Sequence, residues 1–163
     1  MTYNLEDLNR RNFAAIEFYR SLTAKKYNID NTPKEQSTLQ NLNLLANKAQ
    51  EMRDLLGRPM VVTSGYRCPE LNDKLSASAA DSYHLYGLGL DFVVPHMSPR
   101  EVCKFFKDRI ICDKMMASYM WNKKEKRWMK WVHVQFNSNF RSDKNYFLFE
   151  RIKNGKKLFA KIF

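Results

Sequence analysis

Residues 82–91 of the chain read Ser82-Tyr83-His84-Leu85-Tyr86-Gly87-Leu88-Gly89-Leu90-Asp91, and we expect the fold to form around this stretch. It places the imidazole of His84 seven residues before the carboxylate of Asp91. The glycines between them, Gly87 and Gly89, allow tight backbone turns that can bring both side chains to one point. The apolar run Phe92-Val93-Val94 that follows predicts a buried strand, so we expect His84 in the loop leading into it.

A third side chain that could bind a metal lies in a predicted strand farther along the chain. Residues 130–136 alternate so that Trp131, His133 and Gln135 share one face, while the other face is apolar. Catalytic zinc usually takes three protein ligands and leaves one position for water. His84, Asp91 and His133 would supply such a set. By residue type alone, they could also be a loop histidine, a helix-capping aspartate and a strand histidine with no common role.

The pattern of motifs resembles that of the zinc peptidases of family M15, which include D-alanyl-D-alanine carboxypeptidases and phage endolysins. The family motif Ser-x-His-x-x-Gly-x-Ala-x-Asp is matched at Ser82, His84, Gly87 and Asp91, with Gly89 in place of the alanine. Ser-Gly-Tyr-Arg at residues 64–67, Trp-x-His at 131–133 and the segment 21–33 occur in the expected order. The chain is most similar to the peptidase M15A C-terminal, phage-type branch.

The resemblance implies an α+β fold of the hedgehog/DD-peptidase-like type. We expect residues 1–163 to form a single compact domain, with a small, mostly antiparallel sheet and helices packed around it. A chain of 163 residues is long enough to bury a core of its own. No separate cell-wall-binding module is recognised in the sequence.

The resemblance also implies a site. Zn²⁺ would be held by His84, Asp91 and His133, where it would lower the pKa of a water molecule and polarise a peptide carbonyl. Arg67 would stabilise the developing oxyanion or hold a substrate carboxylate. Ser82 and Trp131 would contact the substrate, together with Arg67.

The general base that such a hydrolysis needs is missing from its usual places. Relatives carry an acid three residues before the last histidine, where this chain has Lys130. Others carry a glutamate at the end of the preceding strand, where the nearest equivalent is Ser118. Glu125 and Asp113 are the nearest acids in sequence, and Glu125 is our candidate for the base.

The composition restricts the partners. The chain has 28 Lys and Arg against 17 Asp and Glu, so its net charge is +11. This charge could attract nucleic acid, an anionic membrane surface or an anionic cell wall, but no nucleic-acid-binding motif accompanies it. Three cysteines without Cys-x-x-Cys spacing, Cys68, Cys103 and Cys112, predict reduced, buried thiols.

The N-terminal residues 1–7 lack the basic and apolar segments of a signal peptide, and no apolar run is long enough to cross a bilayer. We therefore expect a monomer made in the cytoplasm, without membrane insertion or specific nucleic-acid binding. The resemblance implies a phage-encoded lysis or virion-associated protein whose partner is a peptidoglycan stem peptide.

Apolar periodicity and turn residues predict the other elements. Helices are expected over residues 5–20, 33–56 and 99–109, and residues 71–80 form a loose helix or a flap over the site. Gly57 ends the second helix, and Ser98 caps the third. Strands are expected over residues 60–63, 110–119 and 128–136, and a C-terminal hairpin turns at Asn154-Gly155.

Three functions are compatible with these observations. The first is a zinc peptidase that cleaves peptidoglycan stem peptides, as a D-Ala-D-Ala carboxypeptidase or as an endolysin-type endopeptidase. The second is a catalytically impaired, zinc-containing module that binds cell wall or a virion partner, as Lys130 and Ser118 suggest. The third is a basic protein associated with nucleic acid, which would bind DNA with a steep salt dependence.

Overall fold

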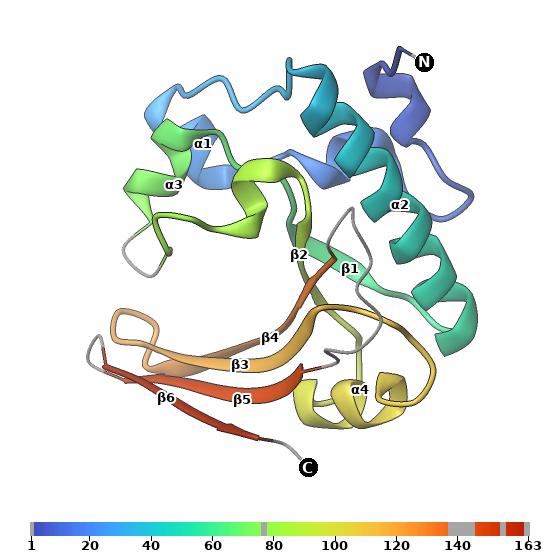
Figure 1. Ribbon diagram of the computed structural model, residues 1–163. Helices are drawn as coiled ribbons and strands as arrows, with labels where there is room; N and C mark the ends of the chain where they lie inside the picture. Colours follow the sequence, from blue (N-terminus) through green and yellow to red (C-terminus); the bar gives the residue numbers. More distant parts are fainter. Residues whose placement is uncertain (1, 76–77, 137–145, 154–155, 162–163) are drawn as a thin grey trace.

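A twisted sheet forms the centre of the computed structural model, which describes residues 2–75, 78–136, 146–153 and 156–161 (Figure 1). Its strands lie in the order β1-β2-β4-β3-β5-β6, and all neighbours are antiparallel except β3 and β5. The bounds are Val61–Ser64 for β1, Gly89–Val93 for β2, Lys114–Asn122 for β3, Arg127–Gln135 for β4, Tyr146–Lys153 for β5 and Lys156–Lys161 for β6. The prediction of an α+β fold with a mostly antiparallel sheet is therefore confirmed.

Helices lie around this sheet (Figure 1). The α-helices are α1 (Leu22–Tyr27), α2 (Gln36–Leu56), α3 (Pro69–Lys74) and α4 (Pro99–Phe106), and the 3₁₀ helices are η1 (Leu5–Leu8), η2 (Ala15–Phe18) and η3 (Tyr83–Tyr86). Within the described ranges, no helix is both long enough and apolar enough to span a bilayer.

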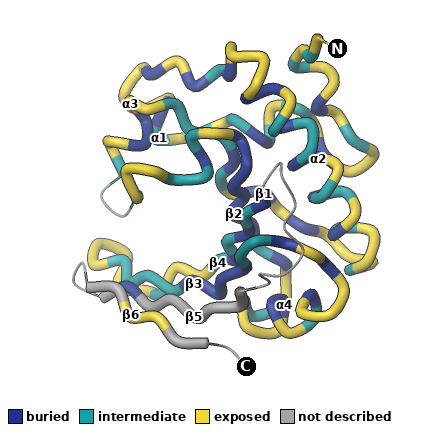
Figure 2. The backbone as a smooth tube through the Cα atoms, in the orientation of Figure 1, coloured by how far each residue is buried: buried dark blue, intermediate teal, exposed yellow. Residues whose placement is uncertain are grey.

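The long helix α2 has the predicted apolar stripe. Its buried apolar residues recur at helical spacing: Leu39, Leu42, Leu45, Ala46, Ala49 and Met52. Figure 2 shows buried and exposed stretches alternating along the tube of α2. Gly57 ends the helix with φ 63°, a left-handed conformation in which its N–H reaches back to the Arg53 and Asp54 carbonyls. The start lies at Gln36 rather than at 33 because Glu35 is still extended (ψ 133°).

The N-terminal prediction was wrong, because residues 5–20 do not form one helix. They form η1 and η2, which are separated by an isolated bridge between Arg10 and Phe13. Phe13 and Phe18 are both buried, at 3% and 0% exposure, although they lie off the expected stripe. In a single helix, the rings of Phe13 and Phe18 and the expected apolar stripe would point in different directions and could not all reach one core. The chain folds back instead.

The strands after α4 are shifted by a few residues from their predicted positions. β3 begins at Lys114 rather than at 110, and the β3–β4 turn occupies the basic segment 123–126. In β4 the predicted alternation is confirmed, since Val132, Val134 and Phe136 are buried in the core. The opposite face of β4 is thereby free to line a site.

Two further predictions concern helix α4 and the C-terminal hairpin. Ser98 caps α4 as predicted, accepting the Glu101 N–H at 3.3 Å, but the helix ends at Phe106 rather than near 109. The C-terminal hairpin strands are present as β5 and β6, and its predicted turn Asn154-Gly155 lies outside the described residues.

Candidate metal centre

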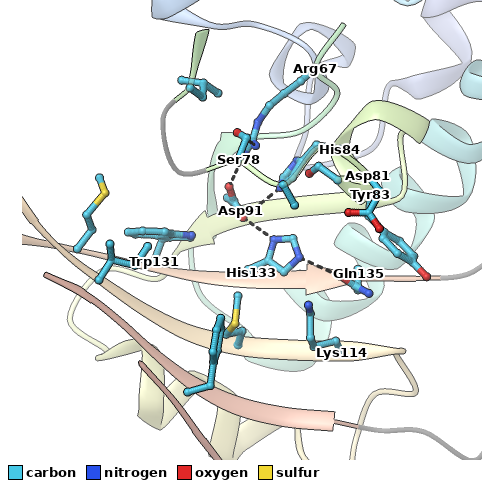
Figure 3. A pocket seen from close by; sticks show the side chains of 17 residues that line it. Arg67, Ser78, Asp81, Tyr83, His84, Asp91, Lys114, Trp131, His133 and Gln135 are labelled. Carbon is cyan, nitrogen blue, oxygen red and sulfur yellow. Dashed lines mark hydrogen bonds and ion pairs between the residues drawn. The ribbon is translucent and has the colours of Figure 1, made fainter. Parts of the chain in front are cut away.

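Three predicted ligands meet where β2, β4 and η3 come together. Asp91 and His133 are direct partners across the β2–β4 pair, and His84 projects from η3 toward both (Figure 3). Asp91 Oδ1 lies 2.8 Å from His133 Nδ1 and 3.4 Å from His84 Nε2, and the three potential ligand atoms lie within 4.8 Å of one another. His84 and Asp91 are buried, at 2% and 8% exposure. The structure thus brings together residues from separate parts of the sequence.

The hydrogen bonds around the two imidazoles favour a cation at this point. His84 Nδ1 lies 2.6 Å from the Gly65 carbonyl, which can only accept, so the Nδ1–H donates and the Nε2 lone pair faces Asp91. His133 Nε2 lies 3.3 Å from Gln135 Oε1, so an N–H there leaves the Nδ1 lone pair facing Asp91 as well. Two nitrogen lone pairs and a carboxylate oxygen then face one another, and no hydrogen atom lies between them to form a hydrogen bond. This donor set fits zinc, whose ligand atoms stand about 3.3 Å apart at bond lengths of about 2.0–2.1 Å.

The pKa values of the buried groups agree with ligand chemistry. Burial lowers the pKa of His84, and this effect outweighs the opposing influence of Asp91, so the imidazole stays neutral. Burial alone would raise the pKa of Asp91, but the neighbouring polar side chains of His84 and His133 hold it well below its usual value. A neutral imidazole and an ionised carboxylate are the forms that bind a metal.

Arg67 holds Asp91 in place. Its Nη2 donates to Asp91 Oδ2 at 2.9 Å, its Nε donates to Ser64 Oγ at 3.0 Å, and its Nη1 donates to Ser78 Oγ at 3.2 Å. The side chains of Arg67 and Asp91 are each only 11% exposed. Because Arg67 occupies Oδ2, the other carboxylate oxygen remains directed at the histidines. Contact between Arg67 and substrate stays a prediction.

The backbone before Arg67 is fixed by a close approach of two chain segments. A Cβ on Gly65 would lie 2.1 Å from the Phe18 carbonyl oxygen, so only glycine fits here. The same carbonyl accepts the Tyr66 N–H at 2.7 Å, and the Arg67 N–H donates to the His84 carbonyl at 3.0 Å. The Ser-Gly-Tyr-Arg motif therefore serves to place both the arginine and the carbonyl that orients His84.

The metal group opens onto a cavity of about 440 Å³ between two parts of the fold. One wall consists of Arg67, Leu75, Ser78, Ala79 and residues 81–84. The other consists of side chains from β3, β4, β5 and β6, including Met116, Trp131, Ile152 and Phe159. Ser82 and Trp131, the predicted substrate contacts, both line it. Figure 3 shows the metal group at the junction of the two walls.

The structure does not bring the proposed base Glu125 to this cavity. Glu125 lies in the β3–β4 turn, where it pairs with Arg127. Lys130 alternates with Trp131 along β4 and so lies on the opposite face of the sheet, beside Phe92 and Val132. An acid at that position would not face the metal group in this strand geometry.

Ser118 and Asp113, the other positions considered for the base, occupy different surroundings. Ser118 is fully buried on β3, directly opposite Trp131. Asp113 lies just before β3 and donates its N–H to the Gln135 carbonyl at 3.0 Å. Burial raises the pKa of the Asp113 carboxyl, which does not line the cavity.

Sequence reasoning missed two charged residues that line the cavity, Asp81 and Lys114. Asp81 directly precedes the recognised motif, and Lys114 opens β3 opposite Gln135. Neither belongs to a motif, so only the position of Asp81 beside Ser82 could have drawn attention to it. Lys114 depends on strand pairing, which no local pattern revealed.

A comparison with family models adds an independent observation. The model described as Peptidase M15 matches residues 11–135, well over half of the 163-residue chain. A comparison with curated proteins finds no match. The matched segment contains His84, Asp91 and His133 together with the residues that orient them. The chain belongs to the peptidase M15 family.

Proposed function

We propose that this protein is a zinc metallopeptidase that hydrolyses peptidoglycan stem peptides. Membership of the M15 family indicates a hydrolase that acts on peptidoglycan-like substrates. The observation that carries the finer proposal is the convergence of His84, Asp91 and His133 on one point at the edge of the cavity. We further propose a phage-encoded lysis or virion-associated role, for which the net charge of +11 is suited because bacterial walls are anionic.

In this reaction water is added across a peptide C–N bond, so that the acyl carbon gains a hydroxyl and the amine gains a proton. Zinc supplies a Lewis acid that polarises the carbonyl and makes water more acidic. Gly65 and Gln135 hold the two imidazoles in the ligand tautomer, and Arg67 holds the Asp91 carboxylate. Trp131 offers an apolar surface on the opposite wall for the peptide.

A group must also take a proton from water and deliver it to the leaving amine. Among the described residues, the carboxylates that line the cavity are Asp81 and Asp91, and Asp91 already belongs to the metal group. Asp81 is therefore the first acid to test. If Asp81 acts as the base, Asp81→Asn lowers kcat by about 100-fold or more with zinc content unchanged.

The test is mass spectrometry of the soluble products from purified sacculi. Zinc-loaded wild-type protein should release stem-peptide fragments whose masses identify the bond that is cut. His133→Ala should release none. His96→Asn is the matched control, since His96 is exposed and lies outside the cavity lining. Intact sacculi after treatment with fully metallated wild-type protein would contradict the proposal.

A second candidate function is a zinc-containing module that binds wall or a virion partner without cleaving it. It is favoured by Ser118, which stands where some relatives are expected to carry a glutamate, whereas Lys130 lies on the face of β4 that points away from the metal group. Cosedimentation with sacculi without any released fragment, at full zinc occupancy, would support this candidate over the peptidase.

A further inference from the structure

Lys114 is a charged residue of the cavity that the metal centre does not use. It is the first residue of β3, it is half-buried, and it lines the cavity. In Figure 3 its side chain extends from β3 toward Gln135 and His133. Within the described part of the chain, Lys114 forms no ion pair, whereas Lys34 and Lys48 do. A half-buried cation without a counterion is suited to bind an anionic group of a ligand.

The other cation of the cavity is already engaged. Arg67 donates to Ser64, Ser78 and Asp91, and its charge is balanced by the Asp91 carboxylate at 2.9 Å. A substrate carboxylate at Arg67 would compete with Asp91 for the same guanidinium. Among the residues that the structure describes, no carboxylate forms an ion pair with Lys114, so it is the better placed of the two to attract a second carboxylate.

The strand register places Lys114 near the metal group. Lys114 is the direct partner of Gln135 across the β3–β4 pair, and Gln135 lies two residues from His133 on the same face of β4. Lys114 and His133 are therefore diagonal neighbours, with backbones about 7–8 Å apart. Successive residues of an extended peptide are about 3.3–3.6 Å apart, so a carboxylate one or two residues from the bond cut lies within reach of the lysine.

We propose that Lys114 binds a free carboxylate of the substrate peptide and thereby selects peptides that carry one beside the bond to be cut. This inference rests on the proposed peptidase function and specifies the substrate class for the same site. The carboxylate can come from the C-terminus of the peptide or from an acidic residue within it. The first source makes the enzyme a carboxypeptidase, and the second makes it an endopeptidase.

The experiment compares kcat/KM for four matched stem peptides that end in D-Ala-D-Ala. The C-terminus is either a free acid or an amide, and the α-carboxylate of the γ-linked D-glutamate is either free or amidated. We expect wild-type protein to lose about tenfold or more in kcat/KM, mainly through KM, when one of these two carboxylates is amidated. The carboxylate whose removal matters identifies the source.

Lys114→Met and Lys114→Gln should remove this preference, while their activity on the amidated peptide stays near that of wild-type protein. Lys114→Arg should retain the preference, because it keeps the charge. Lys130→Met is the matched control: Lys130 is an exposed lysine on the other face of the neighbouring strand and should keep the wild-type preference. Wild-type preference in both neutral Lys114 variants, or no preference in wild-type protein, would overturn the inference.

The inference can be separated from the proposed function by calorimetric binding of the same peptides. If no peptide is cleaved, the peptidase proposal fails. Carboxylate recognition is still supported if wild-type protein binds the free acid more tightly than the amide and Lys114→Met binds both equally. Equal binding of acid and amide, or equal cleavage of both, overturns the role of Lys114 and leaves the peptidase proposal untouched.

Discussion

Asp91 and His133 face each other directly across the β2–β4 pair, with Asp91 Oδ1 2.8 Å from His133 Nδ1. His84 approaches the same carboxylate oxygen from η3, at 3.4 Å, and Arg67 holds the other oxygen. One buried carboxylate therefore joins two strands, a 3₁₀ helix and the segment after β1. The fold and the metal centre depend on the same side chain.

Replacing Asp91 should destabilise the metal-free protein. In Asp91→Asn the charged Arg67 side chain, which is only 11% exposed, loses its counterion. Removing one partner of a buried ion pair costs about 3 kcal/mol. Urea unfolding in the presence of a chelator measures this loss. Asp54→Asn is the control, since it breaks an exposed pair with Arg11 and should cost less than about 1 kcal/mol. Equal losses in the two variants would contradict this description of Asp91.

The stability of the metal-free protein should fall on acidification from pH 7 to pH 5. Burial lowers the pKa of His84 in the folded chain, whereas an unfolded histidine titrates near about 6.5. Between these two values the unfolded chain binds a proton that the folded chain does not, so stability rises with pH. The groups facing His84 are Asp91, which opposes the shift, and Arg67 and His133, which reinforce it.

Thermal unfolding midpoints in chelator at pH 5, 6 and 7 measure this dependence. His84→Gln should flatten it, whereas His96→Asn should leave the slope of wild-type protein. A wild-type midpoint that does not change between pH 5 and pH 7 would show that His84 titrates normally in the folded state. The lowered pKa of Asp91 adds a further loss only below its unfolded value of about 3.9.

Two of the three cysteines should resist alkylation. Burial raises the pKa of Cys103 and of Cys112 to about 12, so both stay thiols at pH 8 and lie inside the core. Native protein treated with iodoacetamide should gain at most one adduct, at the partly exposed Cys68, and denatured protein should gain three. Intact-mass spectrometry distinguishes these outcomes. Rapid addition of two or more adducts to native protein would contradict the described core.

Gly65→Ala should destabilise the protein, because Gly65 is buried against the Phe18 backbone. The added Cβ would lie 2.1 Å from the Phe18 carbonyl oxygen, so the segment leading to Arg67 must move. We expect a loss of about 2 kcal/mol or more in urea unfolding, with weaker metal binding. Gly57→Ala is the control, because no atom lies within 4 Å there and only its φ of 63° is unfavourable, at about 1 kcal/mol. A smaller loss at Gly65 than at Gly57 would contradict the close approach.

The metal group could be predicted from sequence because short motifs, and the resemblance to the M15 family that they carry, mark its members. His84 and Asp91 lie in one short motif, and strand alternation alone placed His133 and Gln135 on the same face. Likewise the stripe of α2 and its stop at Gly57 follow from helical periodicity and backbone conformation. These features depend on neighbours in the chain, which a sequence displays directly.

Features that depend on distant pairing could not be predicted. The bond between Arg67 and Asp91 and the cavity position of Lys114 both arise from sheet register, which joins separate segments. The prediction of one helix over residues 5–20 was wrong for a related reason. Phe13 and Phe18 are buried against α2 and the sheet, and this tertiary packing overrides the weak helical periodicity of the segment.

The central claim is that His84, Asp91 and His133 form a zinc site that drives peptide hydrolysis. The most direct test is to titrate zinc into metal-free protein and to measure the peptides released from purified sacculi at each step. We predict that release rises with added zinc and reaches a plateau at about one equivalent per chain, while His133→Ala releases nothing at any zinc concentration. Protein with a full equivalent of bound zinc that releases no peptide, or metal-free protein that releases as much as the loaded form, would contradict the claim.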